Sequence, residues 1–147
     1  MKKKELREVL FEVELLRRRV IQPQFIQLGL TVGQGQPRVL HCLHANGPMT
    51  QRELADACFL DTATLSRTLD RMEEAGLVLR QPHGTSRRAF QIVLTPAGVQ
   101  TASEVEVIFR GMEETLSEGF TEEELDALLS GIAKVSGNLK RALSQED

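Results

Sequence analysis

The fold of this chain is decided by residues 49–76, MTQRELADACFLDTATLSRTLDRMEEAG. Thr50 and Glu53 have the spacing of a capping box, in which each side chain accepts a hydrogen bond from a free backbone N–H at a helix start. Asp61 is suited to cap a second helix, and Gly76 is suited to end it in a left-handed conformation. Two short helices around a tight turn are typical of a helix-turn-helix unit.

A β-hairpin is predicted directly after this unit. Residues 77–80 and 89–94 are two β-prone runs, and the polar, turn-rich segment 81–88 separates them. We interpret this hairpin as a wing whose tip carries Arg87 and Arg88. A cation so close behind the second helix is well placed to enter a neighbouring minor groove. The alternative is an ordinary surface hairpin.

Further helices are predicted on both sides of this region. Apolar residues recur at helical spacing over residues 6–21, and we expect this first helix to end before Pro23. A short helix is expected over 37–45, a long one over 96–116, and a capped sixth helix over 121–139. The predicted fold class is mainly α (an α+β winged helix), with six helices and a β-hairpin wing.

The second helix of a helix-turn-helix enters the DNA major groove, so its solvent side carries the contacts to bases and phosphates. On that side the sequence places Thr62, Thr64, Ser66, Arg67 and Arg71. Hydroxyls bond bases or phosphates, and an arginine forks onto guanine or pairs with phosphate. The alternative is a solvated helix face, because acidic residues share this side.

The charge of the chain limits where DNA can bind. The formal net charge is −3, and residues 101–147 hold eleven acidic side chains against four lysines and arginines. A DNA-binding surface therefore has to be local, because affinity depends on cations that reach the phosphates. The cations available for it are Arg67, Arg71, Arg80, Arg87 and Arg88.

Four segments resemble signatures of the MarR family of bacterial transcriptional regulators. They are residues 47–55 (GPMTQRELA), 64–73 (TLSRTLDRME), 76–78 (GLV) and 94–98 (LTPAG). The resemblance covers residues 38–100 closely and agrees with the predicted helices on both sides. It implies a homodimer that binds a pseudo-palindromic operator in double-stranded DNA, most commonly a repressor that a small molecule or an oxidant releases. The family wing usually reads Asp-x-Arg, whereas Ser86 precedes the two arginines here.

The resemblance also suggests how the chain is organised. Residues 1–147 are expected to form a single MarR-like domain, with a winged helix-turn-helix DNA-binding lobe over 37–95. Residues 1–30 and 96–147 are expected to form a helical dimerisation region. The long apolar stripes of the terminal helices fit this expectation, and the alternative is that they pack within one chain.

A small-molecule effector is expected near Arg38, His41 and His44, between the dimerisation helices and the lobe, on family analogy. The two histidines lie three residues apart, which could present both to a metal. No third ligand is evident, so we predict neither a metal site nor a cofactor. Cys42 and Cys58 lack paired metal or redox spacing and are interpreted as buried core thiols, although oxidant sensing stays an open alternative.

No catalytic constellation is evident, because the sequence offers neither a nucleophile with its base nor a phosphate-binding glycine loop. The chain is therefore predicted not to be an enzyme. No apolar run approaches the length of a membrane span, so we expect no membrane partner and a cytoplasmic location. The alternative function is a winged-helix dimerisation or protein-binding adaptor without specific DNA binding.

Overall fold

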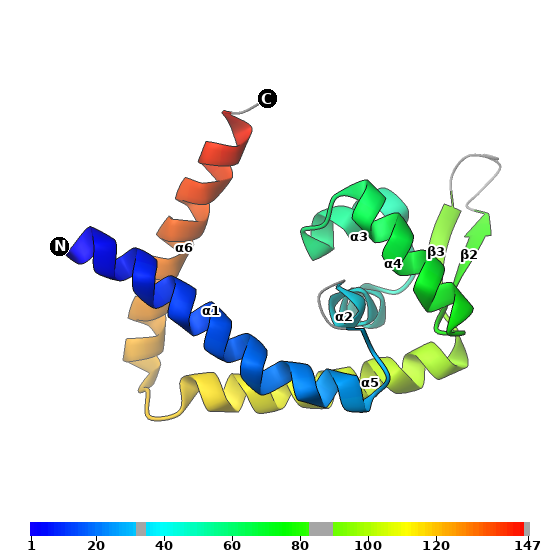
Figure 1. Cartoon of the computed structure of the whole chain (residues 1–147), viewed down its shortest axis with the longest axis horizontal. Helices are drawn as coiled ribbons and strands as arrows, with labels where there is room; N and C mark the ends of the chain where they lie inside the picture. The colour runs from blue at the N-terminus through cyan, green and yellow to red at the C-terminus, as the bar shows by residue number, and fades with distance from the viewer. Residues whose placement is uncertain (32–34, 83–89, 146–147) are drawn as a thin grey trace. The chain divides into compact units, whose positions relative to one another are not determined.

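The computed structural model of the chain describes residues 1–31, 35–82 and 90–145 (Figure 1). Its elements are α1 (Lys2–Gln27), α2 (Gln36–Asn46), β1 (Met49–Thr50), α3 (Gln51–Cys58), α4 (Thr62–Glu74), β2 (Val78–Pro82), β3 (Phe90–Leu94), α5 (Pro96–Ser117) and α6 (Glu122–Ser144). The described part thus contains six helices and one small antiparallel sheet, which confirms a mainly-α winged helix. The chain divides into two compact units, residues 1–110 and 111–147.

The helix-turn-helix forms as its caps predict. Thr50 Oγ1 accepts a hydrogen bond from Glu53 N at 3.2 Å, and Glu53 Oε1 accepts one from Thr50 N at 3.3 Å, so the capping box of α3 is complete. Asp61 Oδ1 accepts from Thr64 N at 2.7 Å and caps α4. Between the helices Phe59 adopts a left-handed φ of 56°. These local bonds fix both helix starts and the elbow that joins them.

The sheet contains one strand more than the sequence predicts. Its order is β1-β3-β2, with β3 in the middle and both pairings antiparallel. Strand β1 has two residues, which is too short for an alternating pattern to reveal. The predicted tip of the wing, with Ser86, Arg87 and Arg88, lies outside the described residues.

One apolar core joins the helix-turn-helix to the sheet. Its largest fully buried side chains are Leu40, Leu54, Leu65, Leu69, Met72, Ile92, Val39, Val78, Val105 and Thr68, from α2, α3, α4, α5, β2 and β3. The buried side of α4 therefore packs into the lobe, while its opposite side is left to solvent (Figure 1).

Helix α1 corrects the prediction that it ends before Pro23. It continues through that proline to Gln27. A proline inside a helix removes one backbone hydrogen bond and crowds the preceding turn. Ile21 and Phe25, on either side of the proline, are both buried, so tertiary packing offsets this cost.

The start of α5 is fitted closely against the end of α4. Thr95 Oγ1 donates a hydrogen bond to the carbonyl oxygen of Gly76 at 2.5 Å and accepts one from Gly98 N at 2.9 Å. A Cβ atom added at Gly98 would lie only 2.0 Å from the carbonyl oxygen of Leu77. Position 98 therefore requires a residue without a side chain, because the backbone opposite it cannot move aside cheaply.

Gly98→Ala is expected to lower the free energy of unfolding by about 3 kcal/mol, at the upper end of overpacking costs. Gly111→Ala, on the same helix, is the matched control, because nothing lies within 4 Å of an added Cβ there. That control should raise the free energy of unfolding by up to about 1 kcal/mol through helix propensity. Urea denaturation of both variants measures the difference, and equal effects would show that the contact at Gly98 is relieved without cost.

The unit formed by residues 111–147 contains α6, in which no residue is buried. Large apolar side chains are exposed along it, namely Leu128, Leu129, Ile132, Leu139 and Leu143. Thr121 and Glu124 complete the predicted capping box at its start. Among the described residues, none of the helices combines the length and apolar character needed to cross a membrane.

Candidate functional site

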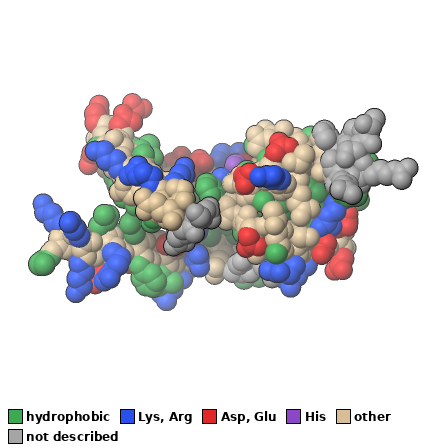
Figure 2. All heavy atoms as spheres, turned by 90° about the horizontal axis from the view of Figure 1, so that it is seen from above, with side chains coloured by type: hydrophobic (Ala, Val, Ile, Leu, Met, Phe, Trp, Pro, Cys, Tyr) green, Lys and Arg blue, Asp and Glu red, His purple; other side chains and the backbone are tan. Residues whose placement is uncertain are grey.

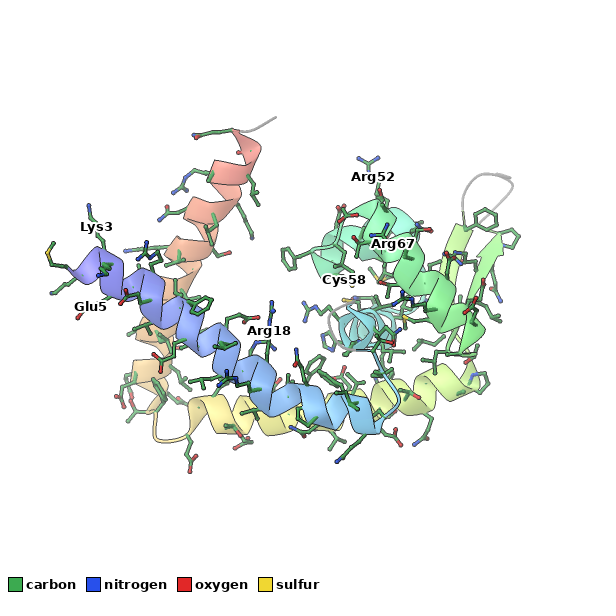
Figure 3. All side chains as sticks on the ribbon, in the orientation of Figure 1. Lys3, Glu5, Arg18, Arg52, Cys58 and Arg67 are labelled. Carbon is green, nitrogen blue, oxygen red and sulfur yellow. The ribbon has the colours of Figure 1, made fainter. Side chains whose placement is uncertain are left out.

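The outer face of α4 carries the polar residues that the sequence analysis selected. Thr62, Arg67 and Arg71 are exposed, whereas Thr64 and Ser66 are half-buried. Figure 3 shows Arg67 on α4 and Arg52 on the neighbouring helix α3. All five selected residues of this helix therefore have at least part of their side chains open to solvent.

A chain of hydrogen bonds orders the first turns of α4. Thr64 Oγ1 donates to Asp61 Oδ2 at 2.8 Å and accepts from Arg67 Nη2 at 3.4 Å. The backbone and hydroxyl hydrogen bonds from Thr64 lower the pKa of the Asp61 carboxyl, so this cap is ionised at neutral pH. Because its proton is used on Asp61, the Thr64 hydroxyl is left as an acceptor and helps to position Arg67.

Arg80 has a different role from the one its charge suggested. Its Nη2 lies 2.9 Å from Asp70 Oδ1 and donates to the backbone carbonyl of Ser66 at 3.2 Å. Its Nη1 lies 3.3 Å from Glu73 Oε1, and its backbone N–H donates to Glu73 Oε2 at 3.2 Å. Arg80 therefore attaches strand β2 to α4 and is not a free cation for phosphate.

This attachment also decides the charge that α4 presents. Asp70 and Glu73 would repel a polyanion, but both are paired with Arg80. In the part of the chain that the structure describes, Arg71 has no ion pair, and Arg67 is bonded only to the Thr64 hydroxyl. The two arginines thus keep donors available on the exposed face.

Arg52, in the first turn of α3, is a further candidate residue that was not among the predicted contacts. This side chain is exposed and extends away from its helix (Figure 3). In helix-turn-helix proteins the first helix crosses the nucleic-acid backbone, so a cation at its start is suited to a phosphate contact. The capping box of Thr50 and Glu53 places Arg52 in the first turn of a helix, so the sequence contains the signal that identifies this residue.

Arg80→Ala is expected to lower the free energy of unfolding by about 1 kcal/mol. Three charge-assisted contacts are lost, but their strength is reduced because the Asp70 side chain is 64% exposed. Arg71→Ala, on the exposed face, should change it by less than about 0.5 kcal/mol. Amide hydrogen exchange along α4 should rise in the Arg80 variant alone, and unchanged exchange there would refute the attachment.

A second candidate site is an open cavity of about 480 Å³ within residues 1–110. It is lined by Arg17, Arg18, Ile21, Gln22, Phe25, Thr31, Gly35, Pro37, Arg38, Cys58 and Phe109. Its wall is therefore mixed, with apolar side chains beside three guanidinium groups. This composition suits an organic ligand that carries a negative charge.

One carboxylate orders two of these arginines. Arg17 donates to Glu14 through Nε at 3.0 Å and Nη2 at 2.8 Å, and Arg18 Nε donates to the same carboxylate at 2.9 Å. The hydrogen bond from Arg17, aided by Arg18, lowers the pKa of Glu14 to about 2. Glu14 is thus ionised at neutral pH and neutralises part of the positive charge at the cavity.

The structure separates the three residues predicted to bind an effector. Arg38 lines the cavity, and His41 stacks edge-on against Phe109, a cavity residue, at 5.3 Å between ring centroids. His41 Nδ1 lies 2.5 Å from Glu106 Oε1 and so joins α2 to α5. His44, in contrast, is exposed and lines a different, shallow pocket with residues of β3 and α5.

The two cysteines lie side by side in the lobe. Both are buried free thiols, and their Sγ atoms are 3.8 Å apart. Burial, together with the neighbouring Cys42, raises the pKa of the Cys58 thiol to about 12. Within the described ranges, no cluster of three or more histidine, cysteine, aspartate or glutamate side chains could hold a metal ion.

Residues 33–90 match the model of the MarR family. A transcriptional regulator of the MarR family from Silicibacter pomeroyi is 25% identical, with 88% of this chain and 86% of that chain covered and a TM-score of 0.73. A mutant of MarR from E. coli, solved with operator DNA, is 23% identical, with 89% and 93% covered and a TM-score of 0.78. NadR, solved with 4-hydroxyphenylacetate, is 23% identical, with 88% and 91% covered and a TM-score of 0.72.

Proposed function

Because the chain belongs to the MarR family, we propose that it is a DNA-binding transcriptional regulator that acts as a homodimer and responds to a small-molecule effector. We further propose that it is a repressor, that its operator is pseudo-palindromic, and that it is not an enzyme. The observation that carries the proposal is the outer face of α4, where arginines and hydroxyls are exposed while Arg80 pairs the acidic residues.

We place the start of α4 in the major groove, as in other helix-turn-helix proteins. Thr62, Arg67 and Arg71 are its exposed polar residues, and Thr64 and Ser66 lie partly open beside them. Arg67 is the proposed base-reading residue, because the Thr64 hydroxyl already orients its guanidinium. Arg87 and Arg88 of the wing remain proposed contacts to the minor groove or the phosphates.

The proposed homodimer is supported by exposed apolar side chains on the terminal helices. On α1 these are Leu6, Val9, Phe11, Val13, Leu15, Leu16, Val20 and Ile26, and α6 carries a second set. Figure 2 shows hydrophobic side chains lying open among lysines and arginines at the N-terminal end of the chain. So much exposed apolar surface is unusual for a monomer and typical of an interface between subunits.

Arg67→Ala is expected to weaken binding to the selected operator by about 1–3 kcal/mol and to relax the base preference at one position per half-site. The operator is first selected from a random DNA pool, and affinity is then measured by fluorescence anisotropy at two salt concentrations. Arg71→Ala is the matched comparison and should weaken binding to all sequences alike if it contacts phosphate.

An inverted repeat with half-sites about one helical turn apart would agree with a dimeric regulator. Full operator affinity in a folded Arg67→Ala protein would remove the base-reading role of this residue. No enriched sequence and no salt-dependent affinity would favour the protein-binding adaptor instead.

The effector is proposed to bind in the cavity lined by Arg38. NadR, a relative in fold, was solved with a carboxylate, 4-hydroxyphenylacetate. In this chain the cavity of about 480 Å³ is large enough for such a ligand, and it combines three arginines with the apolar side chains of Ile21, Phe25 and Phe109. A carboxylate hydrogen-bonds strongly to guanidinium, so we propose an apolar carboxylate as the effector class.

Arg38→Gln is expected to weaken the binding of 4-hydroxyphenylacetate about tenfold, since one charge-assisted contact is lost. Glu14→Gln should strengthen it, because the competing carboxylate at Arg17 and Arg18 is removed. His44→Gln is the control and should leave affinity unchanged, because His44 lines another pocket. Isothermal titration calorimetry measures each affinity.

The matched ligand control is 2-(4-hydroxyphenyl)ethanol, in which an uncharged hydroxymethyl group replaces the carboxylate. It should bind more weakly than the acid to the wild-type protein and equally to wild type and Glu14→Gln. Equal binding of the acid and the alcohol would show that the arginines do not select a carboxylate.

A further inference from the structure

The paired thiols of Cys42 and Cys58 connect the buried core to the cavity. Cys42 belongs to α2 and Cys58 is the last residue of α3, and their Sγ atoms lie 3.8 Å apart. Cys58 also lines the cavity of about 480 Å³, whereas Cys42 is not among the lining residues. A reagent that enters the cavity therefore reaches Cys58 first. The thiol of Cys42 is then close enough to bind the same atom of the reagent.

The separation of the sulfur atoms fits a single bridging atom. Two bonds of about 2.3 Å from one atom, the length found in zinc thiolates, place the sulfurs roughly 3.8 Å apart at a tetrahedral angle and roughly 3.5 Å apart at the angle of about 100° of a pyramidal trivalent atom. A direct disulfide needs about 2.05 Å and would require the two helices to approach. The observed distance thus suits a bridged pair with little backbone movement.

The surroundings favour an uncharged bridging agent over a metal cation or an oxidant. A tetrahedral metal needs more ligands than two thiolates, and no group of three suitable side chains is present in the described part of the chain. Oxidation by peroxides proceeds through the thiolate, whereas burial raises the pKa of Cys58 to about 12. An agent that forms a neutral product leaves no charge in this buried position.

We propose that Cys42 and Cys58 form a dithiol site for a thiophilic ligand with two open valences, of the trivalent organoarsenical class. The arsenic atom bridges the two sulfurs, and its organic substituent occupies the cavity beside Ile21, Phe25 and Phe109. The two thiols supply both bonds, so the site needs no further protein ligand.

The chemistry is a condensation without oxidation or reduction. The hydrated reagent, R–As(OH)₂, reacts with Cys58, an arsenic–oxygen bond breaks, an arsenic–sulfur bond forms, and the thiol proton leaves with hydroxide as water. Cys42 then repeats this step at the same arsenic atom and releases a second water. Because the second thiol is already 3.8 Å from the first, this step is intramolecular and strongly favoured.

The site also lies at the elbow of the helix-turn-helix. Cys58 directly precedes Phe59, the residue with a φ of 56°. Asp61, which caps α4, lies two residues after Phe59. A bridge and substituent placed between α2 and α3 are expected to shift this elbow and weaken operator binding at least several-fold. This consequence rests on the proposed DNA-binding function, whereas the dithiol site itself does not.

The test uses the full chain with phenylarsine oxide as the probe. Intact-mass analysis should show one phenylarsenic group per chain, and a thiol titration after denaturation should show that both free thiols are consumed. The group should survive an excess of 2-mercaptoethanol and be removed by dithiothreitol, because only a dithiol competes with a chelate.

Cys42→Ser and Cys58→Ser each leave one thiol and are the matched controls. Both should lose the phenylarsenic group to 2-mercaptoethanol at least tenfold faster than the wild type, with circular dichroism confirming that they fold. Equal loss from wild type and variants would overturn the site.

Reaction through unfolded protein is excluded by a second measurement. The rate of modification should be unaffected by low urea, whereas a rate that rises steeply with urea would show that only unfolded chains react and would overturn the site.

Operator affinity of the bridged protein is then compared with that of the untreated protein. Stable bridging with unchanged DNA affinity would refute only the coupling to the elbow, and absence of operator binding in untreated protein would refute the proposed function separately.

Discussion

The contact on which the position of the outer face of helix α4 depends is the guanidinium of Arg80, bound between strand β2 and this helix. It pairs with Asp70 and Glu73 and also reaches the backbone carbonyl of Ser66. The apolar core holds one side of α4. The contacts of Arg80 fix the helix to the sheet close to the solvent-exposed side of α4. Asp70 and Glu73 thereby hold α4 in place, and the guanidinium groups of Arg67 and Arg71 stay exposed.

Helix α2 connects the features that surround this lobe. Within its eleven residues, Arg38 faces the cavity, His41 is bonded to Glu106 of α5, and Cys42 contacts Cys58 of α3. These positions follow one another at close to helical spacing, so a single short helix contacts α5 and α3 and also lines the cavity. Packed side chains of α2 therefore link the cavity to Cys58, the residue before the elbow that precedes α4.

The elements that the sequence predicted correctly are those governed by neighbouring residues. The capping boxes at Thr50 and Thr121 and the cap at Asp61 are bonds between residues three positions apart, which one sequence displays completely. The prediction at Pro23 was wrong, because the burial of Ile21 and Phe25 outweighs a local helix breaker. The two-residue strand β1 was missed for a similar reason, since it pairs with β3, a strand far along the chain.

The sequence alone determined the order of the helices, the helix-turn-helix, the two strands of the wing and the outer residues of α4, because helical period and capping are local properties of the chain. Only the tertiary structure decided that Arg80 pairs with acidic residues of α4, that His44 lies apart from the cavity of Arg38, and that Cys42 meets Cys58. Each of these depends on which distant residue packs opposite, and side-chain type and spacing along one chain do not carry that information.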